Sequence, residues 1–318
     1  MLSLSYTKST TLQDTLARID ALRMEILTTP LTVKTEERRI FRSSILAIYT
    51  SLLLNEFPLT IDEIISILTT SKRFTSPTSI AVVSYHNALV WIRQHWTGNR
   101  EPVTAGDLQV LATILFTKPS HIDRVFIQNS QDIESLTMYL SKLSDHPVIQ
   151  AGLAHAYLLA YPMGQSDNGI FARTVQTLIL SQYGYTLRGM ATHTIDADDV
   201  KAFTFAKETI KKYGQCTQWL EYSAATIEKT YKRLYLSLIK ESHAGVKGDI
   251  INRASELSRR EEDIMALLIA PTGKITNRQI QRRFHISSIT ASRHLKKLSN
   301  IGFLSIRGKG RSVYYMRT

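Results

Sequence analysis

Residues 146–189 read HPVIQAGLAHAYLLAYPMGQSDNGIFARTVQTLILSQYGYTLRG, which is two apolar segments on either side of one short loop. The spacing of their apolar residues predicts helices over 147–161 and 168–184. The loop YPMGQSDNG, at 161–169, contains Pro and Gly but no Lys, Arg or His. A loop that leads into a helix N-terminus is a natural anion site, because free backbone N–H groups point out of the helix. The loop is therefore a functional anion-binding site, a site that has lost anion binding, or only a turn.

Helical spacing extends over most of the chain, and the alternation typical of strands is nearly absent before residue 300. Thr60 with Glu63 forms a capping box, and Thr104 opens the segment TAGDLQVLATILF. The segment HIDRVFIQNSQD, at 121–132, is instead short and β-prone. The fold class expected is mainly α. The remaining helices are predicted at 12–27, 36–55, 60–69, 78–96, 104–116, 131–144, 197–212 and 216–241.

The length of 318 residues is enough for two domains, and 43% hydrophobic with 21% charged residues is typical of a soluble globular protein. The one cysteine, Cys216, excludes a disulfide framework and a cysteine-based metal site. The N-terminal stretch lacks the apolar region of a signal peptide, and no apolar run is long enough to cross a membrane. We therefore expect a cytoplasmic protein with no membrane partner.

The net charge of +12 is concentrated at the C-terminus. Residues 264–318 contain no Asp or Glu. They contain eleven basic residues: Lys274, Arg278, Arg282, Arg283, Arg293, Lys296, Lys297, Arg307, Lys309, Arg311 and Arg317. A block of one sign this large indicates a polyanionic partner, and nucleic acid before a membrane.

The same region predicts a winged helix-turn-helix. A helix capped by Ser258 with Glu261 is followed by a short helix that opens near Thr276. A turn leads into a third helix, SITASRHLKKLSNIG, which ends at Gly302. The segment FLSIRGKGRSVYYM then reads as a β-hairpin around Gly308 to Gly310. The third helix of such a module enters the major groove of double-stranded DNA.

Residue types on this third helix and on the wing suit DNA. Its N-terminal face is expected to carry Ser288, Thr290, Ala291 and Arg293, which can bond bases, meet a thymine methyl group or bind guanine. Phosphate contacts are expected from Lys296, Lys297, Arg307, Lys309 and Arg311. The alternative is a solvated basic face on a protein-interaction winged helix.

The segment quoted at the start resembles the core of the Fic family, whose motif is H-P-F-x-[D/E]-G-N-G-R-x-x-R. Both flanks of the loop match, and VSYHNALVWI, CTQWLEYSAATI and the winged helix also look like parts of multidomain Fic proteins. The resemblance covers roughly residues 40–318. It implies a helical domain of the kind that transfers AMP from ATP to protein hydroxyls, often as a homodimer.

Some motif positions are retained. Pro162, Asn168 and Gly169 match the family pattern, and Arg173 stands at its second arginine. The resemblance implies that Asn168, Gly169 and Arg173 are nucleotide- or phosphate-binding positions.

Other motif positions are altered. Tyr161 stands where the family has its proton-accepting His, and Ile170 where it has the first phosphate-binding Arg. Because the loop has one extra residue, the metal-binding acid of the family is either missing or displaced by one residue to Asp167. A tyrosine with a pKa near 10 is a poor base at neutral pH. We therefore expect no standard AMP transfer, and we assign neither a catalytic residue nor a cofactor from the motif.

The resemblance also implies an inhibitory helix with the pattern [S/T]-x-x-x-E-[G/N]. Ser51 keeps the hydroxyl position, whereas Asn55 stands at the Glu position and Glu56 follows it. The usual acidic partner of Arg173 is thus replaced. His155, on the apolar helix before the loop, is interpreted as a hydrogen-bonded packing residue.

The leading hypothesis is a Fic-like protein that regulates through DNA binding by its winged helix. One alternative is a Fic-type enzyme that uses ATP and Mg²⁺ on a target protein, with Asp167, Asn168 and Arg173 around the phosphates. A second is a protein-interaction scaffold. The expected divisions are an N-terminal helical region (1–100), a Fic-like core (101–241), a linker (242–256) and the winged helix (257–318).

Overall fold

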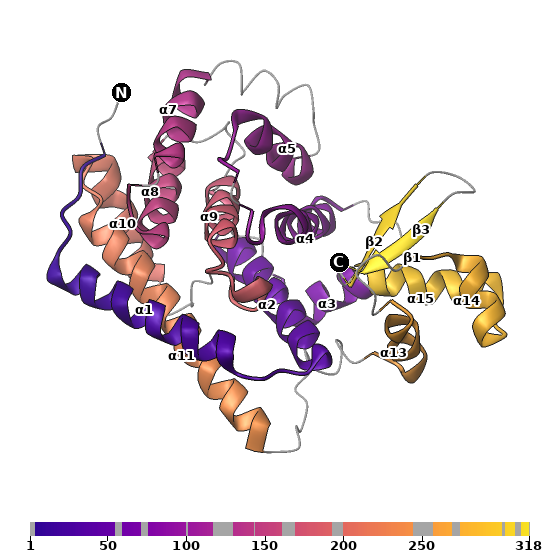
Figure 1. The fold of residues 1–318 in the computed structure, drawn as a ribbon. Coiled ribbons are helices and arrows are strands. Elements are labelled where there is room, and N and C mark those ends of the chain that lie inside the picture. Colours follow the sequence, from indigo (N-terminus) through magenta and orange to yellow (C-terminus); the bar gives the residue numbers. More distant parts are fainter. Residues whose placement is uncertain are drawn as a thin grey trace.

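The computed structural model describes residues 4–54, 59–70, 76–99, 101–116, 130–142, 144–160, 169–192, 200–243, 257–268, 274–300, 303–308 and 313–317. A helical body precedes a small basic module (Figure 1). The body contains α1 (Thr10–Thr28), α2 (Val33–Leu53), α3 (Ile61–Thr69), α4 (Pro77–Trp96), α5 (Ala105–Leu115), α7 (Ser130–Ser141), α8 (Pro147–Ala160), α9 (Ile170–Gln182), the 3-10 turn η1 (Leu187–Gly189), α10 (Val200–Tyr213) and α11 (Thr217–His243).

These helices confirm the ten helical segments that the sequence predicts up to residue 241. Both predicted caps of the body are present: Thr60 and Glu63 form a capping box before α3, and Thr104 forms one before α5 with Asp107. The predicted β-prone segment is wrong at its end, because residues 130–132 begin α7. The rest of that segment, 121–129, lies outside the described residues.

The centre of the body is the pair α8 and α9, which pack against each other. Every residue of α9 from Phe171 to Gln182 is buried, and α4 and α5 also pack on it. A helix that is buried on all sides must satisfy its polar side chains internally. Thr177 donates a hydrogen bond to the carbonyl of Arg173 (3.0 Å), and Gln182 donates to the carbonyl of Glu101 (2.7 Å).

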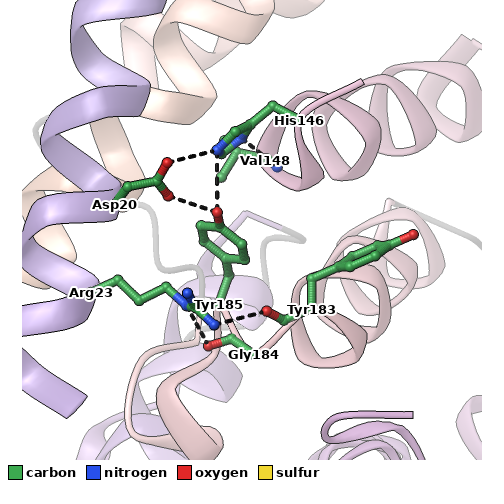
Figure 2. Close-up of polar contacts among 7 residues, drawn as sticks. All are labelled: Asp20, Arg23, His146, Val148, Tyr183, Gly184 and Tyr185. Carbon is green, nitrogen blue, oxygen red and sulfur yellow. Dashed lines mark hydrogen bonds and ion pairs between the residues drawn. The ribbon is translucent and has the colours of Figure 1, made fainter. Parts of the chain in front are cut away.

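Helix α1 lies along α11 and is tied to the body by a polar cluster (Figure 2). The Tyr185 hydroxyl donates to Asp20 at 2.7 Å, and Nε2 of His146 lies 3.3 Å from the same carboxylate. Nδ1 of His146 accepts the backbone N–H of Val148 at 3.2 Å, at the start of α8. Because Nδ1 accepts, the proton of the neutral ring is on Nε2 and can be donated to Asp20.

Arg23 of α1 makes the second half of this attachment. Its guanidinium donates to the carbonyls of Gly184 (3.3 Å) and Tyr183 (3.2 Å) and lies 4.8 Å from the ring centre of Tyr185. Burial, followed by the hydrogen bond to Asp20, raises the pKa of Tyr185, so this hydroxyl stays protonated. We interpret the cluster as the anchor of α1 on the loop after α9.

The C-terminal module confirms the winged helix-turn-helix. It contains α13 (Arg259–Ala266), β1 (Lys274–Ile275), α14 (Asn277–Phe284), α15 (Ser288–Asn300), β2 (Leu304–Arg307) and β3 (Tyr314–Arg317). The strands form an antiparallel sheet in the order β1-β3-β2. The predicted caps at Ser258 and Thr276 are both capping boxes.

The body and the module touch each other. α15 packs against α3, and the ring of His86 in α4 lies against the backbone of Asn300 at the end of α15. His86 is 3% exposed, and burial, with the nearby charge of Arg93 second, lowers its pKa to about 4. This side chain is therefore neutral at physiological pH and packs as an uncharged ring.

Candidate functional site

Helix α9 begins at Ile170, directly after the altered loop, and Gly169 is its N-cap residue. This glycine has φ +82°, in the left-handed region, and its carbonyl accepts the N–H of Arg173 at 3.1 Å. A Cβ placed on Gly169 would lie 3.0 Å from Nη1 of Arg173 and 3.1 Å from Cδ2 of Leu159. The backbone conformation and the surrounding side chains therefore both favour glycine here.

Arg173 is held beneath this helix start by α2. Its Nε donates to Oγ of Ser51 at 2.9 Å, and its Nη2 lies 3.5 Å from the carbonyl of Ser51. Arg173 is 5% exposed and Ser51 is 1% exposed. The two positions that the sequence relates to a motif arginine and an inhibitory-helix hydroxyl are thus in direct contact.

Tyr85 of α4 completes this buried group, and sequence reasoning missed it. Burial raises the pKa of its hydroxyl, while the charge of Arg173 and hydrogen bonds with Ser51 and Thr174 act in the opposite direction. The segment VSYHNALVWI lies within a predicted helix and shares the family resemblance, but no local signal in the sequence marks Tyr85 as part of a site. The site therefore brings α2, α4 and α9 together around one guanidinium.

Several predicted site residues lie outside the described residues. These are Tyr161, Asp167 and Asn168 of the loop, Asn55 and Glu56 after α2, and Lys309 and Arg311 of the wing. Their roles remain predictions. Ile170 is described: its side chain is half-buried and packs against the hydrophobic core.

His155 is a hydrogen-bonded packing residue, as the sequence predicts. Its Nδ1 lies 2.7 Å from Oε1 of Gln176, whose amide donates to Ser223 at 3.0 Å. The ring packs edge-on against Trp219, with 4.8 Å between ring centres. These contacts join α8, α9 and α11.

The second candidate site is the outer surface of α15. Ile289, Arg293 and Lys296 are exposed and recur at i, i+4 and i+7, so they form one stripe along the helix. Leu295 and Leu298 are buried on the opposite face. We call Ile289, Arg293 and Lys296 the outer stripe.

Ala291 corrects the sequence prediction for this face. It is 0% exposed and lies on the buried face with Leu295, so it cannot meet a thymine methyl group. Ser288 is exposed as expected. Thr290 is half-buried, and its hydroxyl lies 2.9 Å from that of Ser287.

Lys297 has a partner that the sequence interpretation did not include. Its Nζ lies 2.8 Å from the carboxylate of Glu261 in α13, and Nδ1 of His294 lies 3.0 Å from the other oxygen. Glu261 is 3% exposed. Burial alone would raise its pKa, but hydrogen bonds from Lys297, His294 and the Ser258 backbone hold that pKa below its ordinary value. Lys297 thus balances a buried charge within the module.

Exposed cations extend the basic surface onto neighbouring elements. Arg278, Arg282 and Arg283 are exposed on α14, and Arg307 is exposed on β2. Asn277 braces α14 against α15, because its amide donates to Oγ of Ser292 at 2.7 Å. The described cations of the module therefore lie on a scaffold with a fixed internal geometry.

Known proteins match both parts of the chain. The profile of a winged helix-turn-helix DNA-binding family matches residues 257–305. A Fic family protein from Desulfovibrio desulfuricans G20 superposes with a TM-score of 0.58 at 14% identity, over 98% of this chain and 97% of that one. Fic-1 (residues 134–508) from C. elegans gives a TM-score of 0.59 at 16% identity, over 71% of each chain. No curated protein matches the chain in sequence.

This chain has the Fic fold. The resemblance in sequence is thereby confirmed for the architecture, with a winged helix-turn-helix at the C-terminus. Arg173, at the position of the second motif arginine, is buried and hydrogen-bonded to Ser51. Ile170, at the position of the first motif arginine, carries an apolar side chain. The described edge of the Fic loop thus lacks one of the two motif cations.

Among the described residues, no group of three His, Cys, Asp or Glu side chains could hold a metal ion. None of the described helices has the length and apolar character needed to span a lipid bilayer. A pocket of about 10 Å³ lies near the end of α9, beside Arg93, Thr177 and Ser181. It has room for about one water molecule.

Proposed function

We propose that this protein is a sequence-specific double-stranded DNA-binding regulator. The observation that carries the proposal is the outer stripe of α15, which presents Arg293 and Lys296 to solvent within the acid-free segment 264–318. Phosphate contacts by exposed Lys and Arg supply affinity, and side chains on a helix in the major groove supply sequence preference. The match to a DNA-binding winged-helix family supports the same function.

The internal electrostatics of the module favour DNA over a protein partner. The carboxylate of Glu261 in α13, beside α15, is buried and paired with Lys297. Asp263 is exposed on α13, whereas the outer stripe of α15 carries the exposed cations Arg293 and Lys296. Clustered positive charge of this kind favours a polyanionic partner over a protein.

We further propose that the Fic-fold body does not transfer AMP and serves instead as a dimerisation or ligand-sensing body. Replacement of a histidine base by Tyr161 typically lowers a rate by about two to four orders of magnitude. Ile170 supplies no charge-assisted donor for a phosphate. Arg173 is buried and contributes to the contact between α2 and α9, which supports a structural role for this residue.

The DNA proposal is tested by electrophoretic mobility shift on duplex fragments, including the protein's own promoter region, at several salt concentrations. We expect binding whose log affinity falls linearly with log salt concentration. Absence of salt-sensitive binding down to low ionic strength would overturn the proposal.

The body is tested by calorimetry with ATP and Mg²⁺ at millimolar concentration, and by label transfer from α-labelled ATP to protein. We expect neither binding nor transfer. Binding that is weakened by Arg173→Ala, together with transfer, would instead establish the enzymatic alternative.

A further inference from the structure

The outer stripe of α15 contains one residue that charge does not explain. Ile289 is 74% exposed, the largest exposed fraction among the large hydrophobic residues of the described chain. It is the second residue of α15, in the first turn of the helix that enters the groove in this fold class. Its neighbours along the stripe are Arg293 and Lys296.

Packing within the molecule does not account for Ile289. The face of α15 that contacts the rest of the module carries Ala291, Leu295 and Leu298, each 0% exposed. Ile289 lies about 200° around the helix from Ala291, because each residue turns the chain by about 100°. Its side chain therefore points away from the module's core into solvent.

An apolar side chain at this position suits one feature of double-stranded DNA. The C5-methyl group of thymine is the apolar contact offered by base edges in the major groove. Arginine at the next position of the stripe suits the O6 and N7 acceptors of guanine. Four residues of helix rise by about 6 Å, which is close to two base steps of about 3.4 Å each.

We infer that Ile289 contacts a thymine methyl group in the major groove while Arg293 contacts a guanine about two base steps away. This inference rests on the proposed DNA-binding function and deepens it, because it names the base pair chemistry that the module reads. Ser288, exposed beside Ile289, is left for phosphate or water-mediated contact.

The test begins with duplexes selected by the full-length protein from a random pool. Each thymine of the selected site is then replaced, one at a time, by deoxyuridine, which removes only the methyl group. We expect one position at which this replacement weakens binding of the wild-type protein about fourfold, the loss expected for one buried methyl-sized group. Replacement of a guanine about two steps away by 7-deazaguanine removes the N7 acceptor and is expected to weaken binding as well.

The variant Ile289→Ala connects the effect to the residue. It should bind with the same affinity to the thymine and deoxyuridine duplexes at that position, while other positions keep the wild-type profile. The matched control is Ile306→Ala, since Ile306 is also an exposed isoleucine (50%) but lies on β2 of the wing. Ile306→Ala should keep the wild-type response to deoxyuridine.

The outcomes separate the inference from the function on which it rests. The inference is wrong, while DNA binding stands, if binding is salt-sensitive but Ile289→Ala loses as much affinity as the wild-type protein at each deoxyuridine replacement. The same holds if binding is salt-sensitive with no response to deoxyuridine at any position. Failure of the wild-type protein to bind any duplex at low salt would overturn both.

Discussion

Tyr85 and His86 are consecutive residues of α4 that face two different parts of the molecule. Tyr85 lies in the buried group around Arg173 and Ser51, whereas His86 lies against the backbone of Asn300 at the end of α15. Both side chains are almost fully buried, at 4% and 3% exposed. One helix thus contacts the buried group at the start of α9 through one residue and the end of α15 through the next.

Ser51→Ala is expected to destabilise the body. The substitution removes the hydroxyl that accepts from Nε of Arg173 at 2.9 Å in a site that excludes water. Loss of a hydrogen bond to a buried charged group lowers the free energy of unfolding by about 1.5–3 kcal/mol. Urea denaturation of the full chain measures the change.

The matched control is Ser135→Ala on α7, whose half-buried hydroxyl donates an exposed hydrogen bond to the carbonyl of Gln131 in its own helix, at 2.7 Å. It should change the free energy of unfolding by less than about 0.5 kcal/mol. Equal effects of the two substitutions would show that the contact between Ser51 and Arg173 does not hold α2 on α9.

Gly169→Ala and Gly98→Ala separate backbone strain from packing. Both glycines have positive φ, +82° and +71°, so alanine at either position costs about 1–2 kcal/mol from the left-handed backbone alone. Only at Gly169 would the new Cβ approach other side chains within 3.1 Å, whereas nothing lies within 4 Å at Gly98. Thermal unfolding should therefore show the larger loss for Gly169→Ala, and an equal loss would contradict the close packing of Arg173 there.

Lys296→Gln and Lys297→Gln are expected to affect DNA binding differently although the residues are adjacent. Lys296 is exposed on the outer stripe, so its replacement should reduce the slope of log affinity against log salt by about 0.9 if it contacts one phosphate. Lys297 is bonded to Glu261, so its replacement should leave the slope unchanged and lower the stability of the module. Fluorescence anisotropy with a labelled duplex at several salt concentrations distinguishes the two, and a reduced slope for Lys297→Gln would show that this residue does reach the DNA.

Acid is expected to destabilise the winged helix through Glu261. Its folded-state pKa is lowered from 4.5, so its contribution to stability is fully present above the unfolded-state pKa and is lost as pH falls through the folded-state pKa. The ammonium group of Lys297 and the ring of His294 face this carboxylate, at 2.8 Å and 3.0 Å. Unfolding of the module should therefore become easier as the pH falls below about 4.5, the ordinary pKa of this carboxyl.

Glu261→Gln provides the control for this pH dependence. Glutamine can still accept the N–H of Ser258 but carries no charge for Lys297, so the variant should be less stable at neutral pH and less sensitive to acid. Near-UV circular dichroism during acid titration follows the transition. If the stability of Glu261→Gln falls with decreasing pH as steeply as that of the wild-type protein, other groups cause the acid sensitivity.

Much of the fold could be predicted from sequence because its determinants are local. Apolar spacing and capping residues such as Thr60, Thr104 and Ser258 mark helices within a few residues of their ends. The strand β1 could not be predicted, because Lys274 and Ile275 form a strand only through pairing with β3, some forty residues later in the sequence.

The candidate sites were less predictable, since they depend on helix phase and on distant contacts. Ala291 was placed on the wrong face because small residues carry little phase information, whereas Leu295 and Leu298 fix the buried side. Ile289 was missed because an exposed isoleucine is indistinguishable from a core residue in sequence. The partners of Lys297 and Arg173 lie 36 and 122 residues away, beyond any local pattern.

The adjacency of Tyr85 and His86 has a thermodynamic consequence. A ligand that displaced Arg173 from Ser51 would alter the packing of α4, and the same helix supports the end of α15. If binding of such a ligand changed the affinity for DNA by some factor, binding of DNA would change the affinity for the ligand by the same factor. In a protein with this arrangement, α4 would link two binding equilibria, one in the helical body and one in the winged helix, and neither could change without the other.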